Sequence, residues 1–257
     1  MAIVNVTPDS FSDGGERLDP ARAIDDGLRF VCEGADIVDV GGESTRPGSQ
    51  AVSADEELRR VLPVVAGLAT RNAVVSIDTR RAEVARACLD SGARIVNDVS
   101  ALRDDPAMLP LVARRGAPVV LMHRRGRPED RYAGPAYRDV VEDVRQFLVD
   151  RAGACEAAGV ASDRIMIDPG IGFGKQPEEE LALIGGAGRL ASAGYPVLIG
   201  ASRKSFIGRL TGVQDPKQRL PASLWLAVEA ARRGAAVVRV HDVAATCQAL
   251  AVSSAMR

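Results

Sequence analysis

The chain has 257 residues, of which 46% are hydrophobic and 26% charged, a composition typical of globular proteins. Its formal net charge of -1 at pH 7 gives no electrostatic basis for general binding to nucleic acid or to an anionic membrane. No apolar run approaches the ~18 residues that span a membrane, and no basic stretch precedes an apolar one at the N-terminus. We therefore expect a cytoplasmic protein with neither nucleic acid nor membrane as a partner.

Short Val/Ile-rich runs alternate along the chain with longer segments of helical pattern. The short runs are nearly continuous in apolar character, which is typical of parallel strands covered on both faces. Strands are predicted at 2–6, 36–42, 73–78, 94–100, 118–123, 164–170, 196–200 and 237–243. Helices are predicted at 19–34, 53–69, 80–91, 106–115, 137–158, 177–193, 220–233 and 243–256.

Residues at the helix ends support these assignments. Asp19 precedes Pro20 as an N-cap, and Ser53 with Glu56 has the spacing of a capping box. A glycine separates several helices from the next strand, as in "EGADIV", "SGARIV", "AGYPVL" and "RGAAVV". The four cysteines are far apart and have no metal-binding spacing, which predicts buried or half-buried free thiols in a reducing compartment.

Eight strand–helix units within about 250 residues predict one α/β domain over 1–257, a single (β/α)8 barrel. An open doubly wound sheet is the alternative. That fold usually carries a G-x-G-x-x-G motif after its first strand, and this chain has none there.

Polar residues stand at or just past the end of every predicted strand, where a barrel of this kind places its chemistry. They are Asn5, Asp39, Asp78, Asn97 with Asp98, His123, Asp168, the run 202–205, and Arg239 with His241. Taken singly, each could be a cap or turn residue. Several interrupt an apolar run at its last buried position, where a carboxylate needs a partner. A polar ligand that donates hydrogen bonds would be such a partner.

The strand-end residues separate into two chemical groups. Asp78, Asn97, Asp168 and Lys204 suit a flat heterocycle with adjacent N–H donors and a carbonyl. Arg239 and His241, together with Mg²⁺ near Asn5, suit a phosphate or pyrophosphate. Two segments, 5–15 and 41–49, are too long and too rich in Gly, Pro and Ser for simple turns, and we expect extended loops that cover the site.

At these loops the chain resembles the dihydropteroate synthase family. The motifs occur in order over nearly the whole chain: "NVTPDSFSDGG", "GGESTRPG", "SIDT", "VNDVS", "LMH", "IDPGIGFGK", "GASRKSFIG" and "VRVHDV". The resemblance implies a homodimeric transferase that uses Mg²⁺ and joins 6-hydroxymethyl-7,8-dihydropterin pyrophosphate to 4-aminobenzoate. It also implies that the C–O bond breaks first, to give a pterin-stabilised cation that the aniline attacks.

The resemblance assigns roles to particular residues of this chain. The pterin would be held by Asp78, Asn97, Asp168, Phe173 and Lys204. Pyrophosphate would contact Asn5, Arg46, Arg239 and His241, and 4-aminobenzoate would contact Phe11, Thr45, Arg46, Pro47 and Ser205. Asn5 and Asp13 would bind the Mg²⁺. The catalytic set would be Asp78, Asp13, Lys204, Arg239 and His241.

The chain departs from the family pattern in three places. We expect the chain to lack the leader that the family usually has before the first strand; "QPEEE" follows "GFGK", and two arginines follow His123. The leader and the "QPEEE" stretch motivate one alternative, a non-catalytic pterin-binding homologue. A sulfonamide-insensitive variant of the synthase is a further alternative, which "SFSDGG" and "STRPG" do not favour because they resemble the loops of sulfonamide-sensitive members. Corrinoid-linked methyltransferases share the barrel and the pterin pocket, but they are not expected to carry "TPDSFSDGG" or "SRKSFIG".

Overall fold

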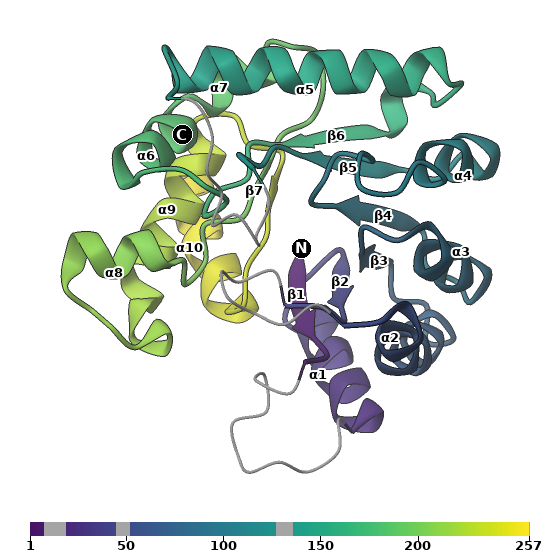
Figure 1. Cartoon of the computed structure of the whole chain (residues 1–257). Helices are drawn as coiled ribbons and strands as arrows, with labels where there is room; N and C mark the ends of the chain where they lie inside the picture. The colour runs from purple at the N-terminus through teal and green to yellow at the C-terminus, as the bar shows by residue number, and fades with distance from the viewer. Residues whose placement is uncertain (8–18, 45–51, 127–135, 257) are drawn as a thin grey trace.

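A computed structural model describes residues 1–7, 19–44, 52–126 and 136–256, in which short parallel strands alternate with surrounding helices (Figure 1). The strands are β1 (Ala2–Asn5), β2 (Val38–Gly41), β3 (Val75–Asp78), β4 (Ile95–Asp98), β5 (Val119–Met122), β6 (Ile165–Asp168), β7 (Leu198–Ile199) and β8 (Val237–Val238). The helices are α1 (Pro20–Cys32), α2 (Ala54–Ala69), α3 (Ala82–Asp90), α4 (Met108–Arg115), α5 (Val140–Ala157), α6 (Pro177–Gly185), α7 (Ala187–Ala191), α8 (Ser205–Thr211), α9 (Leu220–Arg232) and α10 (Val243–Ala255).

The strands close into a barrel. Strands β1 to β6 form one parallel sheet in chain order, and β7 pairs with β8. Parallel bridges join Ile167 to Val197 and Ala2 to Val240, so the β7–β8 pair connects β6 back to β1. The Ile3 N–H also donates to the Val240 carbonyl at 3.0 Å. The predicted (β/α)8 barrel is therefore confirmed, and the open sheet is excluded.

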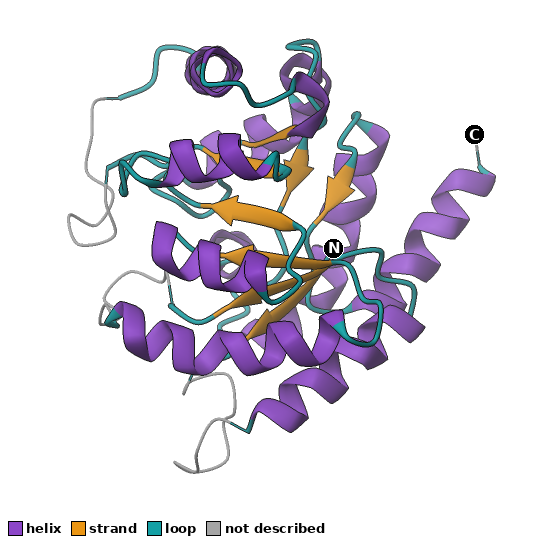
Figure 2. Cartoon of the chain, turned by 90° about the vertical axis from the view of Figure 1, so that its right-hand side faces the viewer, coloured by secondary structure: helices purple, strands orange, loops and turns teal. Residues whose placement is uncertain are grey.

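The barrel wall explains the continuous apolar runs. Side chains that point outward, such as Val38, Val40 and Ile77, are completely buried under the helices. Figure 2 shows the helices packed around the outside of the strands. The inside of the barrel at the amino ends of the strands is also apolar, with Met1, Val120 and Leu198 in one cluster. Polar strand residues are therefore concentrated toward the carboxyl ends.

The helix ends agree in part with the sequence patterns. The Asp19 carboxylate accepts the Ala21 N–H at 2.9 Å, as an N-cap should. Ser53 accepts the Glu56 N–H at 3.2 Å, but the Glu56 carboxylate is bound by Arg59 and Arg60 instead of closing the capping box. The glycines before β2, β4, β7 and β8 all have positive φ, which relieves the steric cost that a side chain would bring.

Three details differ from the sequence-based expectations. The predicted helix over 177–193 is split into α6 and α7 at Gly186, where a Cβ would lie 2.8 Å from Val141. Helix α8, which has only seven residues, was not predicted. Cys32 is exposed, so the prediction of a buried or half-buried thiol was wrong there, whereas Cys88 and Cys155 are buried and Cys247 half-buried. Among the described residues, no helix is long and apolar enough to cross a membrane.

Candidate active site

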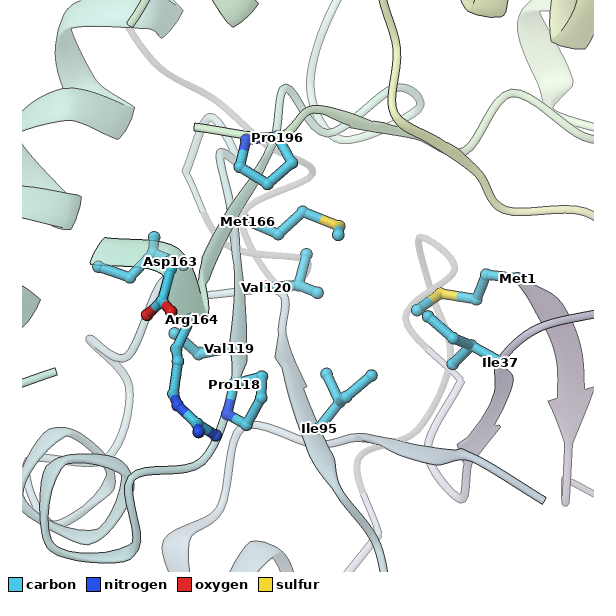
Figure 3. Close-up of a pocket in the computed structure, with 11 residues that line it drawn as sticks. Met1, Ile37, Ile95, Pro118, Val119, Val120, Asp163, Arg164, Met166 and Pro196 are labelled. Atoms are coloured by element: carbon cyan, nitrogen blue, oxygen red, sulfur yellow. The ribbon is translucent and has the colours of Figure 1, made fainter. Parts of the chain in front are cut away.

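One pocket lies at the amino ends of the strands, inside the barrel wall. Figure 3 shows its lining, to which Met1, Ile37, Ile95 and Val120 contribute apolar side chains. Arg164 stands at its edge and donates to the Gly116 carbonyl at 3.0 Å. A ligand site needs a few converging polar groups to orient its ligand, whereas Asp163 and Arg164 are the charged residues of this otherwise largely apolar lining. The polar strand-end residues lie at the opposite end of the strands, which is the candidate site.

Strand register places four strand-end residues in one row. Asn5 is opposite Gly41, Gly41 opposite Asp78, and Asp78 opposite Asn97. A Cβ on Gly41 would lie 3.7 Å from Asp78 Oδ2 and 3.8 Å from Asn5 Oδ1, so both oxygens stand beside this glycine. The pairing of β1 to β4 thus brings one carboxylate and two carboxamides to the carboxyl rim of the barrel.

Arg239, just past β8, forms hydrogen bonds with acidic residues of β2 and β3. Its Nε donates to Asp39 Oδ2 at 2.6 Å and its Nη2 donates to Asp78 Oδ2 at 2.9 Å. Asp39 Oδ2 also accepts from Asn97 Nδ2 at 3.0 Å. Asp39 lies one layer deeper, two positions before Gly41, and is completely buried. The guanidinium therefore compensates the buried carboxylate of Asp39 and the half-buried carboxylate of Asp78.

The pKa values of Asp78 and Asp168 are both raised above those of ordinary aspartates. Burial, and next the negative charge of Asp39, raise the pKa of Asp78 to about 7 despite the opposing charge of Arg239. Burial also raises the pKa of Asp168, with the Gly170 N–H and the charges of Lys204 and Arg239 opposing it. A rim with such acids stabilises a ligand that offers N–H donors or positive charge.

Asp168, Phe173 and Lys204 form the opposite wall. Asp168 ends β6, and its Oδ1 accepts the Gly170 N–H at 2.7 Å. The Lys204 ammonium lies 4.4 Å from the centre of the Phe173 ring. Burial and the charge of Arg239 lower the pKa of Lys204 to about 8, whereas Asp168 raises it. A carboxylate, an aromatic face and an ammonium together suit a flat heterocycle with N–H and carbonyl groups.

Comparison with known proteins decides the family. A family model described as pterin binding enzyme matches residues 1–241. The dihydropteroate synthase of Mycobacterium leprae is 51% identical, over 99% of this chain and 92% of its own length. The chain belongs to the dihydropteroate synthase family of pterin-binding enzymes.

Two solved structures of one family member are closely similar to the structure of this chain. The dihydropteroate synthase of Xanthomonas albilineans with 4-aminobenzoic acid superimposes with a TM-score of 0.92 at 50% identity, over 99% of this chain and 91% of that one. The enzyme from the same organism in complex with 7,8-dihydropteroate has a TM-score of 0.89 at 47% identity, over 99% and 92% of the two chains. The predicted family and barrel are both confirmed.

The structure brings together most of the described site residues that the family motifs indicate. Asp78, Asn97 and Arg239 share one hydrogen-bonded network through Asp39, and Asp168, Phe173 and Lys204 adjoin it. His241 Nδ1 lies 3.0 Å from the Ser202 hydroxyl, and Ser205 is exposed at the start of α8. Phe11, Asp13, Thr45, Arg46 and Pro47 lie outside the described residues.

Two polar residues inside the site have roles that the sequence patterns did not assign. Asp39 was recognised as a strand-end residue but given no function, although it accepts hydrogen bonds from both Arg239 and Asn97. Lys175 of the "GFGK" motif is buried, and its ammonium donates to three backbone carbonyls. The motif itself was the signal for Lys175. Asp39 could have been found from its position two residues before the strand end.

An ion-pair chain runs along the rim from β2 to β5. It alternates acid and base through Glu57, Arg81, Glu43, Arg80, Asp104 and Arg124. Arg81 also donates to the Val52 carbonyl at 2.6 Å, so one guanidinium holds residues on both sides of the segment 45–51. Arg124 belongs to the "HRR" departure from the family pattern. Its side chain is buried against Asp104, which accounts for one of the two extra arginines without a ligand.

The "QPEEE" departure is explained by the start of α6. Pro177 occupies the first turn, and the Glu179 carboxylate accepts the Gln176 N–H at 2.7 Å. Three glutamates in the first turn also interact favourably with the positive end of the helix dipole. This segment therefore forms a well-capped helix start behind the site.

Proposed function

We propose that this chain condenses 6-hydroxymethyl-7,8-dihydropterin pyrophosphate with 4-aminobenzoate to give 7,8-dihydropteroate and pyrophosphate. One observation carries the proposal: the carboxyl rim gathers Asp39, Asp78 and Asp168 with Arg239 and Lys204 in a chain of this family. Solved structures of the relative from Xanthomonas albilineans contain 7,8-dihydropteroate in one case and 4-aminobenzoic acid in the other. Transfer of the pterin-CH₂ group makes the chain a transferase.

Pterin recognition follows from the donor and acceptor groups of the site. We assign the Asp168 carboxylate to the pterin amino group and ring N–H, with Asn97 at the adjacent edge and Asp78 at a further ring nitrogen. Lys204 would donate to the pterin carbonyl, and Phe173 would cover one face of the ring. A carboxylate accepts two parallel N–H bonds, and such charge-assisted bonds contribute about 1.5–3 kcal/mol each.

The charges around the site support an SN1-like reaction. The C–O bond breaks with its electron pair leaving on pyrophosphate, and the 4-aminobenzoate nitrogen then attacks the CH₂ carbon and loses a proton. Negative charge on Asp39, Asp78 and Asp168 at the rim would stabilise the pterin cation. Charge-assisted hydrogen bonds from Arg239 and His241 to the departing phosphates would together contribute several powers of ten in rate.

The residues at the end of β1 fit a magnesium ion that the substrate shares. Asn5 supplies a carboxamide oxygen at the rim, and oxygen donors are what Mg²⁺ prefers. The described residues contain no cluster of three or more Cys, His, Asp or Glu that could hold a metal by themselves. Mg²⁺ usually takes one or two protein ligands together with substrate phosphates. We assign Asn5 and Asp13 to it; when bound, the ion would neutralise charge on the leaving pyrophosphate.

We also propose that two copies of the chain associate. Trp225 on α9 is 66% exposed, and Val252 on α10 is 63% exposed. These helices pack against each other. A second copy that covers α9 and α10 would remove these two side chains from water. The cytoplasm is the compartment that we propose, since all four cysteines are free thiols.

A product assay tests the function. The purified chain with the pterin pyrophosphate and Mg²⁺ is expected to form 7,8-dihydropteroate only when 4-aminobenzoate is present, as followed by chromatography. Pterin binding with no 4-aminobenzoate-dependent product would instead identify a non-catalytic pterin-binding homologue. A sulfonamide competes for the 4-aminobenzoate position, so we expect inhibition that excess 4-aminobenzoate relieves. Full activity at saturating sulfonamide would identify the insensitive variant.

Pterin affinity is expected to weaken at acidic pH. The pKa of Asp78 in the free protein is about 7, and its charged carboxylate accepts a ring N–H more strongly than its neutral acid form. The Kd for 7,8-dihydropteroate should therefore rise by up to about tenfold per pH unit below 7. Titration calorimetry between about pH 5.5 and 7.5 measures it, with Asp78→Asn as the control that cannot titrate. A flat wild-type profile, or the same slope in the variant, would contradict this assignment.

A further inference from the structure

The turn between β6 and α6 is organised around one buried ammonium. Lys175 Nζ donates to the carbonyls of Gly170 at 2.9 Å, His123 at 3.2 Å and Phe173 at 3.3 Å. The residue is only 5% exposed. An ammonium has three N–H donors, so these three carbonyls use all of them. The lysine thus joins the end of β5 to two points of the turn that follows β6.

This arrangement is not an ordinary salt bridge. In the described part of the chain, the hydrogen-bond partners of the Lys175 ammonium are backbone carbonyls, and the nearest acids, Asp168 and Glu180, act only through space. Burial lowers the pKa of Lys175 to about 7. A buried cation is costly unless polar groups compensate it, so the three carbonyl dipoles must be held toward the ammonium. The carbonyls of the turn therefore hold the ammonium in place, and the ammonium holds the turn in one conformation.

The groups held by Lys175 lie directly behind the proposed pterin contacts. Gly170 accepts from Lys175 through its carbonyl and donates its N–H to Asp168 Oδ1 at 2.7 Å. A Cβ on Gly170 would lie 1.8 Å from the His123 carbonyl oxygen, so turn and strand end are packed without room for a side chain. Movement of this turn would therefore move the Asp168 carboxylate.

The aromatic wall depends on the same turn. The Phe173 carbonyl accepts from Lys175, and its ring lies 4.4 Å from Lys204 Nζ. A Cβ on Gly172 would lie 2.9 Å from Lys204 Cδ, so the turn also packs along the Lys204 side chain. The hydrogen bonds from Lys175 to the three carbonyls thus fix the positions of three proposed pterin contacts, which are Asp168, Phe173 and Lys204.

We propose that Lys175 is a positioning residue for the pterin: its ammonium gathers the carbonyls of His123, Gly170 and Phe173 and thereby fixes Asp168 and Phe173 against Lys204. The inference rests on the proposed function of this rim. An uncharged side chain of similar length fills the space but removes one N–H donor from each of the three carbonyls. The Gly170 and Phe173 carbonyls would keep only the backbone N–H groups of Phe173 and Arg125. The role therefore belongs to the charge and the N–H groups of Lys175, and not to its bulk.

The test compares Lys175→Met, which keeps the bulk, with Lys175→Arg, which keeps a cation with N–H donors. Lys175→Met should raise the Kd for 7,8-dihydropteroate and the KM for the pterin pyrophosphate at least tenfold, with the KM for 4-aminobenzoate unchanged. Lys175→Arg should bind the pterin more tightly than Lys175→Met. The exposed Lys217→Met is the matched control and should equal wild type in every measurement.

Chemical rescue separates positioning from packing. Lys175→Ala removes the atoms of one propylammonium ion, so propylammonium added to this variant should restore pterin affinity, whereas 1-propanol should not. Equal rescue by the two compounds, an unchanged Kd in Lys175→Met, or Lys175→Arg binding no better than Lys175→Met would overturn the proposal. Because calorimetry reads pterin binding directly, a wild-type protein that binds but makes no dihydropteroate would refute the proposed reaction and leave this inference intact.

Discussion

Replacement of Arg239 by Met is expected to lower the free energy of unfolding by about 3–5 kcal/mol and to abolish turnover. Arg239 is the cation that contacts both Asp39 and Asp78, and Asp39 is completely buried. Within the described part of the chain, the second oxygen of Asp39 has no hydrogen-bond partner, so this carboxylate depends on Arg239 and Asn97. Without the guanidinium, a buried negative charge is left uncompensated.

Urea unfolding followed by circular dichroism measures the stability change, and the product assay measures turnover. Adding Asp39→Asn to the Arg239→Met variant should recover much of the stability, because the buried charge disappears, but none of the turnover. The control is Arg29→Met on α1, whose ion pairs with Asp26 and Glu33 are exposed and should be worth less than about 1 kcal/mol. An Arg239→Met protein as stable as wild type would show that Asp39 is compensated in another way.

The barrel could be predicted because the local sequence patterns of strands, helices and turns agree with the closed eight-stranded fold. Each strand is a short apolar run, and the glycines before β2, β4, β7 and β8 adopt the positive φ that their position predicted. The break at Gly186 was not predictable from the pattern of 177–193. It arises from tertiary packing, since a Cβ at Gly186 would meet the Val141 side chain of α5.

The sequence predicted only those site residues that stand at the ends of strands. Asp78, Asn97 and Asp168 each interrupt an apolar run and were found in this way. The bond from Arg239 to Asp39 joins residues 200 positions apart, and only closure of β8 onto β1 brings them together. The partners of Lys175 are backbone carbonyls. Every residue carries one, so no residue type in the sequence marks those that bind the ammonium.

Replacement of Asp168 by Ala is expected to weaken binding of 7,8-dihydropteroate by at least about 100-fold. Two charge-assisted hydrogen bonds to the pterin are lost, each contributing about 1.5–3 kcal/mol, and about 1.4 kcal/mol corresponds to a factor of ten. Asp98→Asn is the matched control. Asp98 also ends a strand and is completely buried, but its carboxylate accepts the N–H groups of Ser100 and Leu102 in its own loop. This control should lose stability without losing pterin affinity.

The central claim is that the carboxyl rim around Asp168, Asp78 and Arg239 is the pterin site. Calorimetric titration of 7,8-dihydropteroate into wild type, Asp168→Ala and Asp98→Asn, each checked for folding by circular dichroism, tests it most directly. We predict one site per chain in wild type, a Kd at least about 100-fold weaker in Asp168→Ala, and a wild-type Kd in Asp98→Asn. Unchanged affinity in a folded Asp168→Ala protein would contradict this account of the site.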